Sequence, residues 1–171
     1  MRGYVQVYTG NGKGKTTAAL GLALRAAGAG LRVFIAQFAK GGEYSEIKAL
    51  QRFQENIAVK QYGRGVFING KPAEEDVRAA RKGLAEARER MVSGEYDVVI
   101  LDEANIATSY NLFSAGELLD FIAARPENVE LVITGRSADP RVMEKADLVT
   151  EMKEIKHYFQ KGVKGRDGIE R

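Results

Sequence analysis

The order in which apolar runs and helical patterns follow one another constrains the fold of this 171-residue chain more than any other feature of its sequence. Short runs rich in β-branched residues, which are typical of strands, alternate with segments whose apolar residues recur at steps of three and four, which are typical of helices. We expect strands at residues 4–8, 32–38, 57–62, 98–101, 129–134 and 148–152. Repeated strand–helix–strand units have right-handed crossovers, so the sequence predicts an α/β fold in which helices flank a mostly parallel sheet.

Helices are predicted between these strands from their periodicity and from the signals at their ends. Ser114 and Glu117 have the spacing of a capping box, and Asp139-Pro140 has the form of a helix start. An amphipathic helix should start near Pro72, because apolar or small residues follow it at helical steps. This stripe consists of Val77, Ala80, Leu84, Ala87 and Met91. We expect helices over residues 15–28, 45–54, from near residue 72 to the break at 93–97, 115–125 and 140–146.

The composition excludes several kinds of chemistry. The sequence has no cysteine, so disulfides, zinc–thiolate sites, iron–sulfur clusters and thiol nucleophiles are excluded. No apolar run approaches the roughly 20 residues that cross a bilayer, and the start of the chain lacks the basic and apolar parts of a signal peptide. With 44% hydrophobic residues, the chain suffices for one sizeable core. We therefore expect one cytoplasmic domain over residues 1–171, with no membrane partner.

The positive charge of the chain is concentrated at its carboxyl end. The net charge is +3, and residues 153–171 carry six Lys or Arg against three acidic residues, so the remaining residues are neutral overall. This distribution gives no support for a nucleic-acid-binding face. The basic tail, 153–171, either reaches a phosphate-bearing ligand or is a solvated charged segment.

The stretch TGNGKGKTT, residues 9–17, joins the first predicted strand to the first predicted helix. Glycines allow positive φ angles and leave room for an anion, and the first amides of a helix point at the same place. Lys15 can reach the terminal phosphates of a nucleotide, and the Thr16 hydroxyl can bind Mg²⁺. The predicted phosphate-binding residues are Gly10, Asn11, Gly12, Lys13, Gly14, Lys15, Thr16 and Thr17.

The spacing of this loop departs from the usual phosphate-loop pattern, G-x-x-x-x-G-K followed by Ser or Thr. With Gly14, Lys15 and Thr16 aligned, the first glycine of the pattern falls at Thr9, and Gly10 comes one residue late. The start of the loop is therefore tighter than usual, which affects how a nucleotide lies on it. The alternative is a glycine-rich turn with incidental lysines, but the strand before it and the helix after it favour phosphate binding.

Two further segments place polar residues at the carboxyl ends of predicted strands. Asp102 and Glu103 follow the apolar strand 98–101, where a carboxylate can hold Mg²⁺ beside the phosphates. Arg136 follows the strand 129–134, and its guanidinium is suited to bidentate contact with phosphate. Taken alone, Asp102 and Glu103 are commonly just a solvated strand end, and Arg136 is equally compatible with a surface arginine that caps a helix end.

The segments TGNGKGKTT, VVILDEAN, VITGRSADPRVMEKADLVTEM and the closing KEIKHYFQKGVKGRDGIER together resemble the ATP:corrinoid adenosyltransferases of the CobA/BtuR type. The resemblance covers nearly the whole chain. It implies a P-loop NTPase (RecA-like) architecture and transfer of the 5′-deoxyadenosyl group of ATP to the Co(I) of a reduced corrinoid, with release of triphosphate. Cob(I)alamin and cob(I)yrinic acid a,c-diamide are the substrates that the family implies.

The resemblance also implies the partners and the roles of single residues. Lys15, Glu103 and Arg136 match catalytic positions of the family. Thr16, Asp102 and Glu103 match the side that holds Mg²⁺ or Mn²⁺. A homodimer and a reductase that supplies the electron to cobalt are implied by the family alone.

The corrin-facing part of the site is predicted at residues 62–70. Some members of the family place a Phe and a Trp around the corrin ring, but this chain has no tryptophan. Phe67, together with Tyr62, is the candidate for this role, and the alternative for Phe67 is ordinary core packing.

Two other functions are compatible with a phosphate loop. A P-loop ATPase or kinase would cleave the β–γ bond of ATP, with Glu103 positioning water. A non-catalytic nucleotide-binding switch would bind ATP in order to arrange a partner surface.

Overall fold

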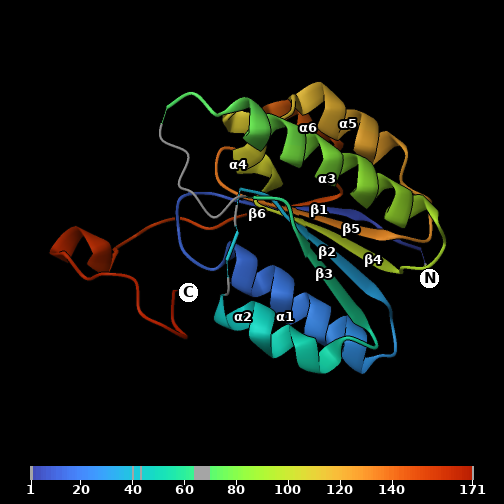
Figure 1. Cartoon of the computed structure of the whole chain (residues 1–171), viewed down its shortest axis with the longest axis horizontal. Coiled ribbons are helices and arrows are strands. Elements are labelled where there is room, and N and C mark those ends of the chain that lie inside the picture. Colours follow the sequence, from blue (N-terminus) through green and yellow to red (C-terminus); the bar gives the residue numbers. More distant parts are fainter. Residues whose placement is uncertain (1, 40, 43, 64–69, 171) are drawn as a thin grey trace.

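The computed structural model describes residues 2–39, 41–42, 44–63 and 70–170, and its core is a parallel sheet. Six strands are hydrogen-bonded in the order β3-β2-β4-β5-β1-β6 (Figure 1). The strands are β1 (Val5–Thr9), β2 (Val33–Gln37), β3 (Ile57–Gln61), β4 (Val98–Asp102), β5 (Glu130–Thr134) and β6 (Leu148–Glu151). The predicted α/β fold with a parallel sheet is thus confirmed.

Helices cover both faces of this sheet (Figure 1). One face packs against α1 and α2, and the other against α3, α4, α5 and α6. The helices are α1 (Lys15–Gly28), α2 (Ser45–Leu50), α3 (Glu74–Val92), α4 (Ala104–Ser109), α5 (Ala115–Ala123) and α6 (Pro140–Lys145), with 3₁₀ turns at Gln51–Phe53 and Tyr158–Lys161. In the described part of the chain, no helix is long and apolar enough to cross a membrane.

Two neighbouring interior strands, β2 and β4, explain why the core lies on both sides of the sheet. Every residue of β2 and β4 is buried, as their unbroken apolar runs predict. Because successive side chains of a strand point to opposite faces, Phe34 packs with the α3 side while Val33 and Ile35 pack with the α1 side. Both faces of the sheet are therefore covered by helices, and the positions that the helices leave uncovered lie at the ends of the strands.

Several helix boundaries differ from the sequence prediction. The helix predicted at 45–54 is α2 followed by a 3₁₀ turn, and α3, whose start was predicted near Pro72, begins two residues later at Glu74. The Ala73 N–H donates to the Asp76 carboxylate at 3.2 Å, and this bond stabilises the later start. The helix α4 was not predicted, because its six residues follow β4 directly. The predicted capping box is present, with the Ser114 hydroxyl accepting from the Glu117 N–H at 3.1 Å.

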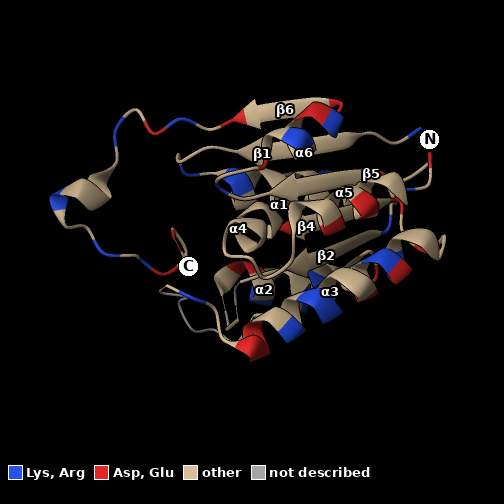
Figure 2. Cartoon of the chain, turned by 90° about the horizontal axis from the view of Figure 1, so that it is seen from above, with Lys and Arg blue, Asp and Glu red and all other residues tan. Residues whose placement is uncertain are grey.

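All six strands of the parallel sheet end at the same edge, and the loops after them meet there. Viewed from above, the sheet has β6 at one border, and the segment after β6 runs away from the body with Lys and Arg along it (Figure 2). Parallel sheets bind ligands outside the carboxyl ends of their strands. The loop between β1 and α1 lies at this edge.

Candidate functional site

The glycine-rich loop, residues 10–14, lies against the end of β6. Gly10 and Gly14 have φ angles of 95° and 116°, which favour glycine. The Gly12 N–H donates to the Met152 carbonyl at 2.7 Å. A Cβ atom on Gly12 would lie 2.7 Å from the same carbonyl oxygen, so no larger residue fits without moving the backbone. The close contact with Met152 therefore requires glycine at position 12.

Lys15 is the central cation of this loop. Its side chain is buried, and its ammonium donates to the carbonyl oxygens of Gly10 and Gly12, both at 2.7 Å. The loop is thus folded around the ammonium, and Lys15 is also the first residue of α1. An anion at this loop would meet the lysine charge and the amides of the helix start together.

Asp102 is the central anion on the opposite side of the site. It is fully buried at the end of β4. One carboxylate oxygen accepts from the hydroxyls of Thr16, at 2.9 Å, and Thr134, at 2.7 Å. The other oxygen accepts from the Gln37 side-chain amide at 3.1 Å. A buried carboxylate is costly unless it is hydrogen-bonded, and these three donors satisfy Asp102.

The hydrogen bonds of Asp102 belong to a longer chain of polar residues at the sheet edge. The side-chain amide N–H of Gln61 donates to the side-chain oxygen of Gln37, Oε1, at 3.1 Å. Each of these polar residues closes one strand: Gln61 ends β3, Gln37 ends β2, Asp102 ends β4 and Thr134 ends β5. These four strands are neighbours in the sheet. We did not assign Gln37, Gln61 or Thr134 from the sequence. The sequence signal that could have indicated these residues is that each is a polar residue at the end of a mostly apolar strand.

Glu103 lies directly after Asp102 in a rare backbone conformation. Its φ angle is 61°, in the left-handed region that non-glycine residues seldom adopt. Its N–H donates to the Thr134 hydroxyl at 3.0 Å, and α4 begins at the next residue. Such strain concentrates at functional sites, which makes Glu103 a candidate for a functional role.

The other predicted site residues differ in whether they are exposed or buried. Arg136 is exposed in the turn after β5, and among the described residues its side chain has no hydrogen-bond or ion-pair partner. Asn11 and Thr17 are exposed as well. Tyr62 is buried in the core, where its ring stacks on Phe38 with centroids 5.8 Å apart. Phe67 lies outside the residues that the structure describes.

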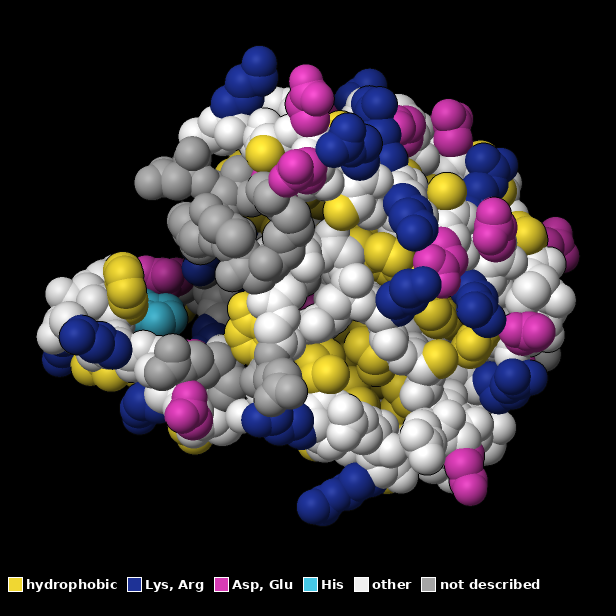
Figure 3. Space-filling view, viewed as in Figure 1, with side chains coloured by type: hydrophobic (Ala, Val, Ile, Leu, Met, Phe, Trp, Pro, Cys, Tyr) yellow, Lys and Arg dark blue, Asp and Glu magenta, His cyan; other side chains and the backbone are white. Residues whose placement is uncertain are grey.

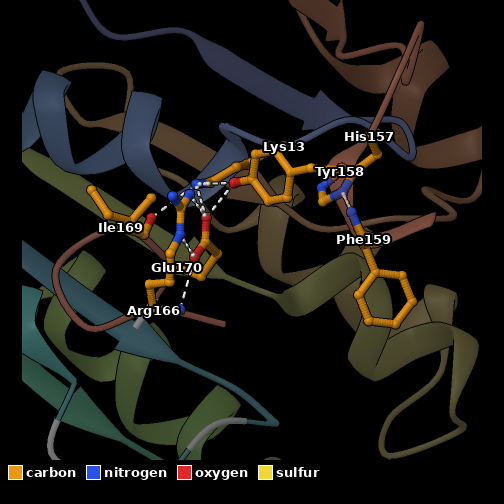
Figure 4. A network of polar contacts seen from close by, with 7 residues as sticks. All are labelled: Lys13, His157, Tyr158, Phe159, Arg166, Ile169 and Glu170. Atoms are coloured by element: carbon orange, nitrogen blue, oxygen red, sulfur yellow. Dashed lines mark hydrogen bonds and ion pairs between the residues drawn. The ribbon is translucent and has the colours of Figure 1, made fainter. Parts of the chain in front are cut away.

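Lys13 points toward the carboxyl-terminal segment instead of toward the loop interior (Figure 4). Its ammonium donates to the Tyr158 hydroxyl at 3.2 Å, the Ile169 carbonyl at 2.9 Å and the Glu170 carboxylate at 3.0 Å. The hydrogen bond to Glu170 raises the pKa of Lys13 above its usual value. The two lysines that were predicted to bind phosphate therefore point to different places. Lys15 faces the backbone of the loop, and Lys13 faces the carboxyl-terminal tail.

His157 has a local structural role. Its Nδ1 atom accepts the Phe159 N–H at 3.0 Å and so caps the 3₁₀ turn that follows.

An all-parallel α/β sheet with a glycine- and lysine-rich loop between its first strand and first helix is typical of nucleotide-binding proteins. Comparison with known proteins narrows this class. The family model for ATP:corrinoid adenosyltransferase BtuR/CobO/CobP matches residues 1–171, so the chain belongs to this family.

Individual relatives agree with the family model. The chain is 36% identical over 170 residues to the corrinoid adenosyltransferase of Pseudomonas aeruginosa, covering 99% of this chain and 84% of the relative. It is 34% identical to the corrinoid adenosyltransferase of Escherichia coli, with 99% and 86% of the two chains covered. It is 33% identical to the corrinoid adenosyltransferase CobA of Salmonella typhimurium, with the same coverage of 99% and 86%.

Proposed function

We propose that this chain transfers the 5′-deoxyadenosyl group of ATP to the cobalt of a reduced corrinoid and releases triphosphate. The family match over the whole chain supports the reaction class. The observation that carries the proposal is the pairing of the loop folded around Lys15 with the Thr16–Asp102 contact. Together they place a cation, helix amides and a carboxylate around one end of the sheet. Cob(I)alamin and cob(I)yrinic acid a,c-diamide are the proposed corrinoid substrates.

The proposed reaction is one nucleophilic displacement. The electron pair of Co(I) attacks C5′ of ATP and forms the cobalt–carbon bond, while the C5′–O5′ bond breaks and its electrons leave with the triphosphate oxygen. Cobalt is thereby oxidised formally from +1 to +3. Co(I) is a very strong nucleophile, so the protein has no need of an activating base. Its task is to place C5′ and to stabilise the leaving group.

The residues of the loop suit the second of these tasks. Lys15 and the amides at the start of α1 would hold the triphosphate as its charge increases. Arg136, which is exposed at the same sheet edge, is a further proposed phosphate ligand. The resemblance to the family also implies an unusual orientation of the nucleotide across the loop, and the first glycine, which comes one residue late, agrees with it.

Mg²⁺ or Mn²⁺ fits the oxygen atoms on the metal side of this site. Thr16 and Asp102 offer a hydroxyl and a carboxylate in direct contact, and Glu103 offers a second carboxylate at the adjacent residue. Among the described residues there is no group of three or more acidic, histidine or cysteine side chains for a metal. A nucleotide-bound Mg²⁺ takes few protein ligands and completes its shell with phosphates and water. The bound cation would neutralise charge on the departing triphosphate.

The architecture and the setting are proposed with the reaction. We infer a RecA-like P-loop NTPase architecture, a homodimer and a cytoplasmic enzyme that receives its electron from a separate reductase. The resemblance to the family supports the architecture, the homodimer and the reductase, whereas the cytoplasmic setting is the expectation from the sequence alone. Cleavage of the β–γ bond and a non-catalytic switch are the less favoured alternatives, because the family match names adenosyl transfer.

Product analysis tests the proposed function. The protein is incubated with ATP, MgCl₂ and cobalamin that has been chemically reduced to Co(I). We expect triphosphate and a corrinoid whose cobalt–carbon bond is cleaved by light. ADP and phosphate would instead indicate β–γ cleavage, and unchanged ATP would indicate the switch.

A further inference from the structure

The carboxyl-terminal segment, residues 153–170, leaves the sheet after β6 and returns to the phosphate loop. Figure 1 shows it as a long loop apart from the helices, and Figure 3 shows it as a separate lobe beside the body. Its 3₁₀ turn at Tyr158–Lys161 lies far out on this loop, and its last residues come back toward α1. We call this segment the strap.

Burial of apolar side chains does little to hold the strap. Ile155, Phe159 and Ile169 are 90%, 73% and 55% exposed. Segments with few buried apolar contacts open at low cost in free energy. The position of the strap therefore depends strongly on its polar contacts.

These polar contacts meet at Glu170 and Lys13 (Figure 4). The Glu170 carboxylate accepts from the Lys13 ammonium at 3.0 Å, from the Tyr158 hydroxyl, and from the Arg166 guanidinium at 3.1 and 3.2 Å. It also accepts the Arg166 backbone N–H at 2.8 Å. The Arg166 guanidinium lies over the Tyr158 ring, 5.1 Å from its centroid. One residue of the phosphate loop, Lys13, and four residues of the strap thus form one cluster, which consists of Tyr158, Arg166, Ile169 and Glu170 on the strap side.

The donors of Lys13 are fully used in this cluster. An ammonium group has three N–H donors, and Lys13 has three acceptors, on Tyr158, Ile169 and Glu170. A triphosphate on the loop would have to take at least one of these donors in order to bind Lys13. It would also repel the Glu170 carboxylate, while its several negative charges attract the ammonium more strongly than a single carboxylate does.

We propose that nucleotide and strap compete for Lys13, so that binding of the triphosphate releases the strap from the phosphate loop. Tyr158, Ile169 and Glu170 hold the ammonium until the nucleotide takes it, and Arg166 holds Glu170 in place. This proposal rests on the proposed function, because it requires ATP at the loop. The basic charge of the strap suggested either a phosphate partner or a solvated segment. The proposal gives the strap a defined role in nucleotide binding.

Hydrogen exchange of the full chain tests the release directly. The N–H groups of Arg166, Ile169 and Glu170 are hydrogen-bonded within the strap, so their exchange reports whether it is held. We expect saturating MgATP to accelerate their exchange severalfold. We also expect Glu170→Gln to show the faster exchange without nucleotide. Exchange that is unchanged or slower in the presence of bound MgATP would overturn the competition.

The affinity for MgATP gives a second readout with a matched control. If the strap competes, weakening it tightens nucleotide binding, so Glu170→Gln should lower the dissociation constant roughly two- to fivefold, as expected for an exposed ion pair. Glu154→Gln removes the same charge from the strap, but Glu154 contacts only Gln160 in the described structure, at 2.8 Å, so it should leave the affinity unchanged. Tyr158→Phe removes a hydroxyl without changing the charge and should also tighten binding.

The outcomes separate this inference from the proposed function. If Tyr158→Phe or Glu170→Gln weakens MgATP binding, the strap supports the nucleotide instead of competing with it, and the inference is wrong while the proposed function stands. If the unaltered protein binds no MgATP in calorimetry, both proposals fail.

Discussion

The Thr16 hydroxyl donates to the Asp102 carboxylate at 2.9 Å and thereby joins the first turn of α1 to the end of β4. This contact connects the helix that follows the glycine-rich loop to the acidic side of the candidate site. It also places the Asp102 charge beside the helix end that would receive the phosphates.

Asp102→Asn should weaken metal binding at this contact. The amide keeps the shape of the side chain but loses its charge, so we expect affinity for Mn²⁺ in the presence of ATP to fall by about tenfold or more. Electron paramagnetic resonance of free and bound Mn²⁺ measures this change. Asp120→Asn, at an exposed position of α5, serves as the control. Equal Mn²⁺ affinity in the unaltered protein and in both variants would show that Asp102 does not contribute to metal binding.

Lys15→Ala should reduce adenosylation sharply. The change removes the ammonium that lies between the Gly10 and Gly12 carbonyls, so the leaving triphosphate loses its nearest proposed cation. We expect a loss of roughly 100- to 1,000-fold in kcat/KM, as for other groups that stabilise developing charge. The rate of cobalt–carbon bond formation, followed by visible absorbance, gives the value. A variant with a near-normal rate would show that Lys15 has only a structural role.

Gln37→Leu should destabilise the fold more than Gln61→Leu. Gln37 is fully buried, and its loss leaves the Asp102 oxygen and the Gln61 amide without this partner. We expect the free energy of unfolding to fall by about 1–3 kcal/mol. Gln61 is partly exposed, so water can replace its bonds and the cost should be smaller. Urea denaturation of both variants measures the difference, and equal costs would contradict the role of burial.

Gly12→Ala and Gly21→Ala form a matched pair. A Cβ atom at position 12 would lie 2.7 Å from the Met152 carbonyl oxygen, whereas a Cβ at position 21 in α1 meets no atom within 4 Å. We expect Gly12→Ala to lower stability and to weaken MgATP binding as the loop moves. Gly21→Ala should raise stability by about 0.5–1 kcal/mol, because alanine favours a helix. Thermal denaturation measures the stability of both variants, and calorimetry measures their binding of MgATP. A harmless Gly12→Ala would show that the loop has room.

The amino end of α6 should show a pH dependence in strong acid. Hydrogen bonds from Arg141 lower the pKa of Asp139 to about 2, and the Asp139 carboxylate also caps the helix. Since the folded pKa lies below the unfolded value of about 3.9, this contribution is complete above about pH 4 and is lost as the pH falls through about 2. Carbon-detected NMR titration of the Asp139 carboxyl measures the pKa. Arg141→Gln should move it back toward the usual value, and an unchanged midpoint would refute the assignment.

The sequence predicted the layers of this fold well, because burial imposes clear patterns on the strands. The apolar runs of β2 and β4 indicated strands covered on both faces, and each is buried throughout. The short helix α4 left no such pattern, since it starts at a strained Glu103 without a helix-start signal. Short elements whose position depends on tertiary contacts carry little local information.

The site was predicted only as far as local motifs reach. The loop around Lys15 and the acidic pair at the end of β4, Asp102 and Glu103, could be read from neighbouring residues. The hydrogen bonds from Gln61 through Gln37 to Asp102 could not, because they require the order of the strands in the sheet. The contact between Lys13 and Glu170 joins residues 157 positions apart, so no local pattern could indicate it.

The return of the strap to the phosphate loop has a practical consequence for handling this enzyme. Glu170 binds Lys13 of the loop, so a purification tag fused to the carboxyl end of the strap would begin beside the proposed nucleotide site. The amino-terminal residues precede β1 and lie at the far end of the strands (Figure 1). Tags, surface linkers and fluorescent labels therefore belong at the amino terminus if nucleotide binding is to be measured on an undisturbed protein.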